Sequence, residues 1–285
     1  MRLISTISLI TLILANALSQ NIKVPTLSPF TEISQEVGLT EISISYSRSS
    51  AKGRAIFGEL VPYNEVWRTG ANASTKLTFT EDVKIGNNPL VAGTYALYTI
   101  PGKDNWTIII HKNTKLRSIA GDAYKQENDA FRFVAEVINN PLKIETFTIH
   151  FADITSNTIN VAIAWENTMV KFPIEVEVDS KVVAQIAELM DNPDNVKAST
   201  YFRAVEYYFH NNKSVEKSEE WILTGLEKSP KNFRYGLLYA KILNGKGDKE
   251  KAITTIQEAN QWARDANNAN YIGQTQLFMD ELNGN

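Results

Sequence analysis

The spacing of apolar residues along the chain changes once, near residue 180. From Ile42 to Val178 apolar and polar residues alternate, as in Ile42, Ile44 and Tyr46, which is the period of half-buried β-strands. Short strands of this kind, separated by Gly, Asn and Pro, are typical of an antiparallel sandwich or barrel. After Ser180 the period becomes about 3.6, that of an α-helix. The pattern predicts a mainly β N-terminal domain followed by an all-α C-terminal domain.

The helical part carries a weak internal repeat. Small residues at Ala240, Ala252 and Ala259 would let two helices approach closely, and the segment from Phe233 resembles a tetratricopeptide repeat, a helical hairpin of about 34 residues. An earlier copy has Glu206 where a small residue is expected. Two imperfect copies are fewer than the three or so that form a free solenoid. We expect these tetratricopeptide-like hairpins to pack on the β domain or to finish a short bundle.

The beginning of the chain has the pattern of a secretory signal peptide. Arg2 precedes an apolar run over residues 3–14, and small residues follow at Ala17 and Ser19. The run is too short for a membrane span, which needs about 20 residues. We expect cleavage after Ser19 or Ala17, and export to the periplasm or the medium. The remaining chain divides into an N-terminal extension, a β domain and a helical domain, at residues 20–38, 39–178 and 179–285.

Composition removes several classes of function. The chain has no cysteine, which excludes disulfides, thiol nucleophiles and lipid attachment to an N-terminal cysteine. Without Arg2 the 29 basic residues fall to 28 against 32 acidic ones, a formal charge of −4. Nucleic-acid binding domains are usually strongly basic, so we expect no nucleic-acid partner. No second apolar run is long enough to span a bilayer, and we expect no membrane span in the mature chain.

Residues 48–74 interrupt the alternation between two predicted strands, and we call them the excursion. A hairpin needs about 2 to 5 residues there, whereas this segment is far longer and holds apolar residues such as Ile56 and Trp67 that can be buried. We expect it to be ordered and to build a site. The residues expected to bind a ligand are Arg48, Lys52, Arg54, Tyr63, Trp67, Arg68 and Asn72.

The composition of the excursion favours an anion. Guanidinium groups bind carboxylate or phosphate through two hydrogen bonds, and an exposed Trp or Tyr offers a stacking face. The sequence therefore predicts a non-enzymatic binding module for a small anionic ligand, either a carbohydrate or a peptide carboxylate. A purely structural alternative is also open. The arginines could pair with Glu59, Glu65 and Glu81 while the aromatic rings fill the end of the β domain.

Two other functions remain open from the sequence. A hydrolase of exported polymers would need a pair of carboxylates or a nucleophile in a cleft, and Glu59 with Glu65, or Ser49 or Ser50 with Lys52, are the nearest candidates. No catalytic residue is assigned. A protein-interaction scaffold would use an exposed aromatic groove on the C-terminal helices, involving Tyr201, Tyr207, Tyr208 and Trp221.

Metal chemistry has little support in the sequence. The three histidines, His111, His150 and His210, are scattered and lack the spacing of zinc ligands. Asp122, Glu127 and Asp129 form an acidic segment without the pattern of a calcium loop. We expect neither a metal nor a cofactor.

Several blocks of the β region resemble one family. They are SRSSAKGRAIFGELVPYNEVWRTGANAS from Ser47, LVAGTYALYTIPGKDNWTIII from Leu90, IETFTIHF from Ile144 and AWENTMVKFPIEV from Ala164. Together they resemble domain of unknown function 2911, a family of exported bacterial proteins, over residues 39–178. The chain departs from the family at Ser49, Asn64 and Ala73, where proline, glycine and an acidic residue are expected. The resemblance implies a β-sandwich and export, and it brings no catalytic residue.

Overall fold

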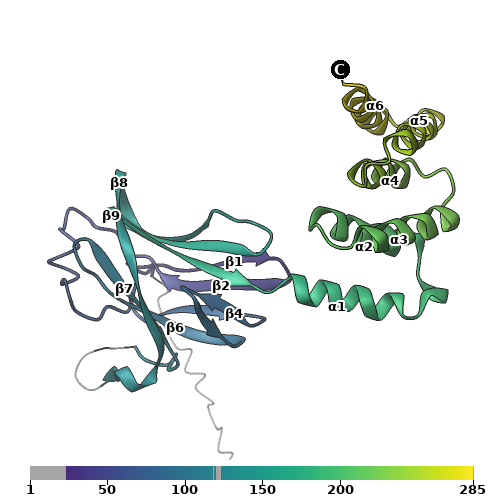
Figure 1. Ribbon diagram of the computed structural model, residues 1–285. Helices are drawn as coiled ribbons and strands as arrows, with labels where there is room; N and C mark the ends of the chain where they lie inside the picture. The colour runs from purple at the N-terminus through teal and green to yellow at the C-terminus, as the bar shows by residue number, and fades with distance from the viewer. Residues whose placement is uncertain (1–23, 118, 120–122, 285) are drawn as a thin grey trace, which may run out of the picture. The chain divides into compact units, whose positions relative to one another are not determined.

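The computed structural model describes residues 24–117, 119 and 123–284. The predicted signal peptide, residues 1–19, lies outside this part of the chain, as does Asp122. The chain divides into two compact units, which meet between Val178 and Asp179. The first unit holds the strands and the second holds the helices (Figure 1). The prediction of a β domain followed by an all-α domain is confirmed.

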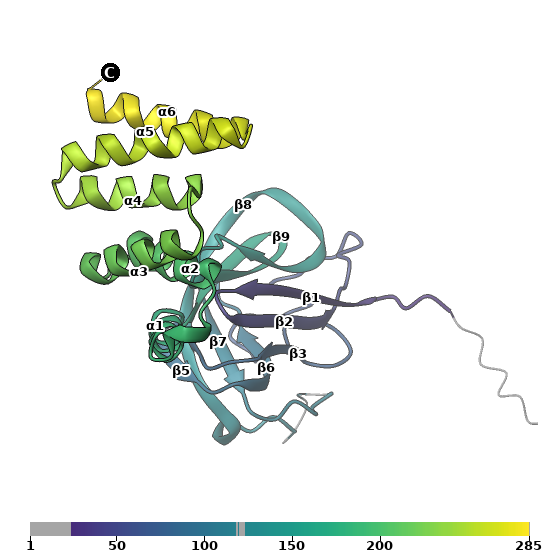
Figure 2. The same cartoon turned by 90° about the vertical axis from the view of Figure 1, so that its right-hand side faces the viewer.

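Nine strands form one antiparallel sheet in the β unit, in the order β1-β2-β3-β6-β7-β8-β9-β4-β5. Figure 2 shows β1, β2 and β3 side by side and the long β8 sweeping around the unit. The strands are β1 (Phe30–Val37), β2 (Thr40–Ser47), β3 (Thr75–Phe79), β4 (Val83–Ile85), β5 (Asn88–Leu90), β6 (Gly93–Ile100), β7 (Asn105–His111), β8 (Asp129–Ala152) and β9 (Thr158–Val176).

Strand β8 connects the two halves of this sheet. Its first part, up to Glu136, pairs with β7, and its second part, from Val137 onward, pairs with β9. The register with β9 shifts twice between Asn139 and Thr148, as at a bulge, and bulges bend a strand. The sheet can therefore fold over, and its two inner faces pack on each other as in a β-sandwich.

The core between the two faces follows the predicted alternation. Ile42 and Ile44 of β2 and Leu77 of β3 belong to the same fully buried cluster as Ile163 and Phe172 of β9. Burying a side chain of this size contributes about 1.5–3 kcal/mol. The period of two in these strands thus arises because alternate side chains point into this core and the others point to the opposite face of the sheet.

Strand β1 lies inside the segment that the sequence analysis assigned to an N-terminal extension. Residues 30–37 pair with β2 along their whole length. Only Val37 is buried, and the other positions are exposed or half-buried, because β1 is the edge strand of the sheet. An edge strand with one buried residue has little apolar alternation, so its sequence pattern is weak.

Six helices form the second unit. Four of them begin with a side chain that accepts a hydrogen bond from the first turn, which satisfies an otherwise unpaired N–H: Ser214, Asn232, Asp248 and Asn268. In the part of the chain that is described, no helix is long and apolar enough to cross a membrane. The helices are α1 (Asp179–Met190), α2 (Ala198–His210), α3 (Val215–Lys228), α4 (Phe233–Gly245), α5 (Lys249–Asp265) and α6 (Ala269–Asn283).

The aromatic residues predicted to line an exposed groove lie in the core of the helical unit. Tyr201, Tyr208 and Trp221 are at most 7% exposed and belong to one apolar cluster, while Tyr207 is half-buried against the same cluster. The prediction of an exposed groove at these residues is wrong. Large aromatic side chains at helical spacing are more readily explained as core, because they bury the most apolar surface per residue.

Candidate functional site

The excursion is ordered by backbone hydrogen bonds to both halves of the sheet. The N–H of Ala51 donates to the carbonyl of Glu145 in β8 at 2.8 Å, and Phe147 N–H donates to Ser49 O at 2.8 Å. Trp67 and Thr99 of β6 exchange two such bonds, at 2.7 and 2.9 Å. These bonds hold the excursion against β6 and β8.

The excursion also concentrates left-handed backbone. Four of its non-glycine residues have positive φ: Lys52, Asn64, Thr69 and Asn72. This conformation is uncommon outside glycine and is a genuine outlier for β-branched Thr69, whose hydroxyl lies 3.0 Å from that of Thr99. Among non-glycine residues Asn tolerates it well, which explains how Asn64, at φ 63°, can stand where the resemblance led us to expect glycine. Such strain is often found at functional sites.

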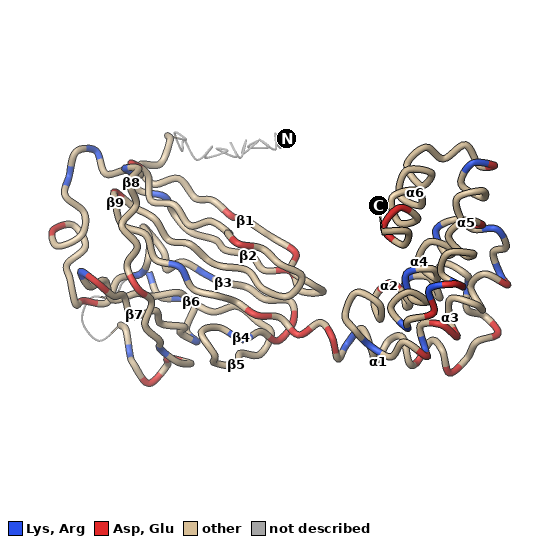
Figure 3. Tube along the Cα trace, turned by 45° about the horizontal axis from the view of Figure 1, so that its top comes forward, with Lys and Arg blue, Asp and Glu red and all other residues tan. Residues whose placement is uncertain are grey.

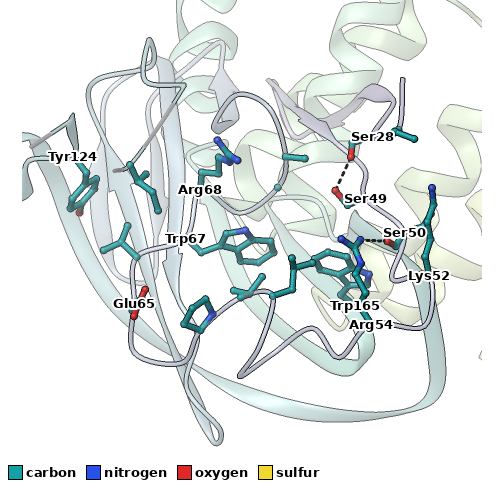
Figure 4. A pocket seen from close by; sticks show the side chains of 18 residues that line it. Ser28, Ser49, Ser50, Lys52, Arg54, Glu65, Trp67, Arg68, Tyr124 and Trp165 are labelled. Atoms are coloured by element: carbon teal, nitrogen blue, oxygen red, sulfur yellow. Dashed lines mark hydrogen bonds between the residues drawn. The ribbon is translucent and has the colours of Figure 1, made fainter. Parts of the chain in front are cut away.

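A cavity of about 890 Å³ lies beneath the excursion (Figure 4). Its lining comes from the segment before β1, from the excursion, from the connection between β7 and β8, and from Trp165 of β9. These parts are far apart in the sequence, so only the fold brings them together. Four residues predicted to bind a ligand line the cavity: Lys52, Arg54, Trp67 and Arg68.

Two tryptophans form an apolar floor for this pocket. The rings of Trp67 and Trp165 are stacked, with centroids 6.1 Å apart and planes at 19°. Trp67 also meets Phe57 and Phe147 edge-on, at 6.2 and 5.1 Å. Trp165 is almost fully buried, and its indole N–H donates to Glu145 O at 3.1 Å. The floor is therefore rigid, and half-buried Trp67 presents part of its ring to the cavity.

Three cationic side chains surround this floor. Arg54 donates from Nε to Ala51 O at 3.0 Å and from Nη2 to Ser50 O at 2.8 Å. Arg68 donates from Nη1 to Asn72 O at 3.2 Å and to Arg117 O at 2.6 Å. The Lys52 ammonium has no partner among the described residues, and none of these cations forms an ion pair there. Backbone carbonyls thus orient both guanidinium groups without neutralising them.

Acidic residues are distributed unevenly around the β unit. In Figure 3, Lys and Arg mark the excursion beside the segment that precedes β1, Asp and Glu are frequent at the opposite end near β1, β2 and β4, and a few acidic segments lie at the excursion end as well. Among the described residues, Glu65 is the pocket's one acidic lining residue, and it is exposed. Glu59 does not line the pocket. The structure therefore does not bring the two glutamates together around this cavity.

The remaining predicted ligand residues support the fold rather than the pocket wall. Arg48 donates from Nε to Phe147 O at 3.2 Å and from Nη2 to Thr148 Oγ1 at 2.9 Å, which ties the end of β2 to β8. Asn72 donates from Nδ2 to Ser28 O at 3.3 Å. The ring of Tyr63 packs so closely on Gly58 that a Cβ there would lie 2.8 Å from it.

The serines near Lys52 are engaged elsewhere. The hydroxyls of Ser49 and Ser28 lie 2.8 Å apart, and those of Ser50 and Thr146 lie 3.0 Å apart. Neither serine is hydrogen-bonded to Lys52, so the structure does not assemble a serine-lysine pair.

Sequence reasoning missed the five lining residues outside the excursion, which are Leu27, Ser28, Ile119, Tyr124 and Trp165. Each comes from a distant segment, and a single sequence holds no signal that pairs them with the excursion. Tyr124 donates to Asp129 Oδ1 at 2.8 Å and accepts from Arg132 Nη2 at 2.7 Å. Burial, and next the Asp129 carboxylate, raise the pKa of Tyr124 further above its ordinary range, so the phenol stays protonated and keeps its hydrogen bond to Asp129.

The described residues contain no group of three or more side chains that could hold a metal ion. His111 is buried, and its ring nitrogens contact the backbone of Asn113 and Lys125. His150 is half-buried in β8, and His210 ends α2. The three histidines thus lie on separate elements of the structure.

Comparison with known proteins identifies the family of this chain. The comparison with curated proteins gives no match. Residues 28–174 match the family described as protein of unknown function (DUF2911). The match takes in β1 to β8, most of β9 and the whole excursion, and therefore nearly every residue that lines the pocket. The chain belongs to the DUF2911 family.

Proposed function

We propose that this protein is an exported, non-enzymatic binding module that holds a small organic anion in the pocket beneath the excursion. The observation that carries the proposal is the lining. Lys52, Arg54 and Arg68 surround a tryptophan floor, and among the described residues none of their side-chain cations forms an ion pair, although the backbone N–H of Lys52 donates to Glu145 Oε1 at 2.7 Å. Cations left unpaired beside an apolar cavity favour a ligand that brings its own negative charge.

The orientation of the arginines supports tight recognition. The hydrogen bonds of Arg54 use Nε and Nη2, which leaves Nη1 for a ligand, and those of Arg68 use Nη1, which leaves Nη2 and Nε. A guanidinium already held by backbone carbonyls loses less side-chain entropy when it binds. Such charged hydrogen bonds contribute about 1.5–3 kcal/mol each.

The size of the cavity suits a small molecule. Ligand pockets usually measure about 300–1,000 Å³ and combine an apolar lining with a few polar groups. The pocket, at about 890 Å³, falls in this range. Both a carbohydrate acid and a peptide carboxylate would fit by volume.

Hydrolysis receives less support from the same residues. A carboxylate-pair mechanism needs two carboxyl groups across the scissile bond, and Glu65 lines the pocket without Glu59. A serine mechanism needs a base beside the nucleophile, and the Ser49 and Ser50 hydroxyls face other hydroxyls. The binding function therefore stands ahead of the enzymatic one.

Export is supported by the sequence of residues 1–19, which lie outside the described part of the chain. The charge at Arg2, the short apolar run and the small residues before Gln20 form the pattern of a signal peptide. An exported binding module would meet its ligand in the periplasm or outside the cell.

A thermal-shift screen tests the binding function. Residues 20–285 are heated with anionic sugars, carboxylates, peptides and phosphates, beside a Lys52→Gln, Arg54→Gln double variant and a Lys112→Gln control. Lys112 is an exposed lysine that does not line the pocket. A ligand at 100 times its dissociation constant adds about 2.7 kcal/mol. We expect a rise in the melting temperature that the double variant loses and the control keeps; no rise with any anion would contradict the proposal.

A further inference from the structure

We propose that the ligand is a short peptide with free ends and an apolar C-terminal side chain. This inference rests on the proposed binding function and narrows it. The C-terminal carboxylate would lie at Lys52 and Arg54, the apolar side chain on the Trp67 floor, and the N-terminal ammonium at Glu65. Three features of the lining support this arrangement.

The first feature is the separation of charge across the pocket. Figure 4 shows Lys52 and Arg54 on one side of Trp67, Glu65 on the other, and Arg68 above Trp67 in this view. Glu65 is exposed and has no hydrogen bond or ion pair among the described residues. A ligand that carries only negative charge would leave this carboxylate unmatched or would be repelled by it. A ligand with an ammonium at its other end complements both sides.

The second feature is the shortage of neutral hydrogen-bonding side chains. The hydroxyls of Ser28 and Ser49 bond each other, Ser50 bonds Thr146, and Tyr124 bonds Asp129 and Arg132. A carbohydrate carries a hydroxyl on almost every carbon, and each one removed from water without a partner costs free energy. Each of these side-chain hydroxyls already has a protein partner, so fewer of their donor and acceptor positions are left for a carbohydrate.

The third feature is the apolar part of the wall. Leu60, Val61, Pro62 and Val66 of the excursion line the pocket together with Trp67. Leu60 is 45% exposed, which is a large exposure for an apolar side chain that faces a cavity. An aliphatic side chain of the ligand would cover this surface and gain about 25 cal/mol for each Å² removed from water.

Capped peptides test the two ends of the ligand independently. The probe is alanyl-alanyl-leucine in three forms: with free ends, N-acetylated, and C-amidated. The proteins are wild type, Glu65→Gln, the Lys52→Gln, Arg54→Gln double variant, and Glu59→Gln as a matched control. Glu59 is an exposed glutamate of the same excursion that does not line the pocket. Dissociation constants are measured by calorimetry at low ionic strength, because salt screens exposed charges.

Each cap should weaken binding only to proteins that keep the charged side chain proposed to bind that end of the peptide. We expect N-acetylation to weaken binding to wild type and Glu59→Gln about three- to fivefold, and to leave Glu65→Gln unaffected. We expect C-amidation to weaken binding about tenfold in wild type, with little effect in the double variant.

Two outcomes overturn the inference without touching the proposed function. In one, wild type binds the free and the acetylated peptides with equal affinity, and Glu65→Gln binds both as wild type does. The other is no binding of any peptide by a protein that binds a different organic anion at Lys52 and Arg54. Absence of binding by every anion, peptides included, contradicts the proposed function itself.

Discussion

At the scale of single residues, the cations of the excursion divide into two kinds. Arg48 gives its hydrogen bonds to Phe147 and Thr148 of β8 and does not line the pocket. Lys52 lines the pocket, and its ammonium has no partner in the described structure. The first residue therefore belongs to the fold, and the second is free to serve a ligand.

Replacement of Arg48 tests this division. We expect Arg48→Met to lower the free energy of unfolding by about 1–3 kcal/mol, because the carbonyl of Phe147 loses its donor at a half-buried position. Urea denaturation of the β unit followed by tryptophan fluorescence measures the change. Lys52→Gln serves as the control and should change stability by less than about 0.5 kcal/mol. Equal stability of the two variants would contradict the structural role of Arg48.

Single residues also set the limit of prediction from this sequence. Of the seven residues predicted to bind a ligand, Lys52, Arg54, Trp67 and Arg68 line the pocket, and their role in binding stays a prediction. Which arginine faces the cavity depends on bonds to β8, which is about 100 residues away in the sequence. Trp165 could be predicted only as a core residue of a strand, because its stacking on Trp67 is a long-range contact.

At the scale of elements, helices α4 and α5 approach each other closely at Gly236. A Cβ on this glycine would lie 2.7 Å from the Cβ of Ala259 and 2.9 Å from the ring of Trp262. Gly273 in α6 has nothing within 4 Å of the corresponding position. Both glycines thus lie within helices, but only Gly236 is packed against a neighbouring helix.

Alanine at these two positions should have opposite effects. Gly273→Ala is expected to stabilise by about 0.5–1 kcal/mol, because alanine restricts the unfolded chain and favours the helix. Gly236→Ala gains the same helix propensity but overpacks the contact, and overpacking costs about 1–3 kcal/mol. Thermal unfolding followed by far-UV circular dichroism gives the sign of each change. A stabilising Gly236→Ala would mean that α4 and α5 lie further apart than described.

The type of each element could be predicted better than its partners. A period of two predicts strands and a period of about 3.6 predicts helices, because one face of each must be buried. The strand order could not be predicted, since β6 follows β5 in sequence yet pairs with β3 and β7. The contribution of β1 was missed because an edge strand needs no alternating pattern.

At the scale of the whole molecule, each unit has its own core. The β unit buries one large cluster that includes Ile42 and Phe172, and the helical unit buries clusters that include Val205 and Ile256. All the pocket residues lie before Val178. Folding and ligand binding by the β unit should therefore not require the helices.

Separate expression of the units tests their independence. Residues 20–178 should bind the same anions as residues 20–285 with a dissociation constant within about threefold, a difference of under 1 kcal/mol. Residues 179–285 should give a helical circular dichroism spectrum with a cooperative thermal transition. Loss of binding by a folded β unit would show that the helices contribute to the site.

The export proposal makes a prediction for the mature chain. Expressed from Met1 in a bacterial host, the protein should be recovered outside the cytoplasm and should begin near Gln20, or two residues earlier if cleavage follows Ala17. Fractionation followed by N-terminal sequencing measures both. Recovery of a cytoplasmic protein that retains residues 1–19 would contradict export.

The most direct test of the whole account is a calorimetric titration of residues 20–285 with the best anion from the thermal-shift screen. We expect one binding site, and a dissociation constant at least about tenfold higher in the Lys52→Gln, Arg54→Gln variant, since charged hydrogen bonds contribute about 1.5–3 kcal/mol each. The Lys112→Gln control should bind like wild type. Equal affinity in all three proteins, with melting temperatures unchanged, would contradict a binding site beneath the excursion.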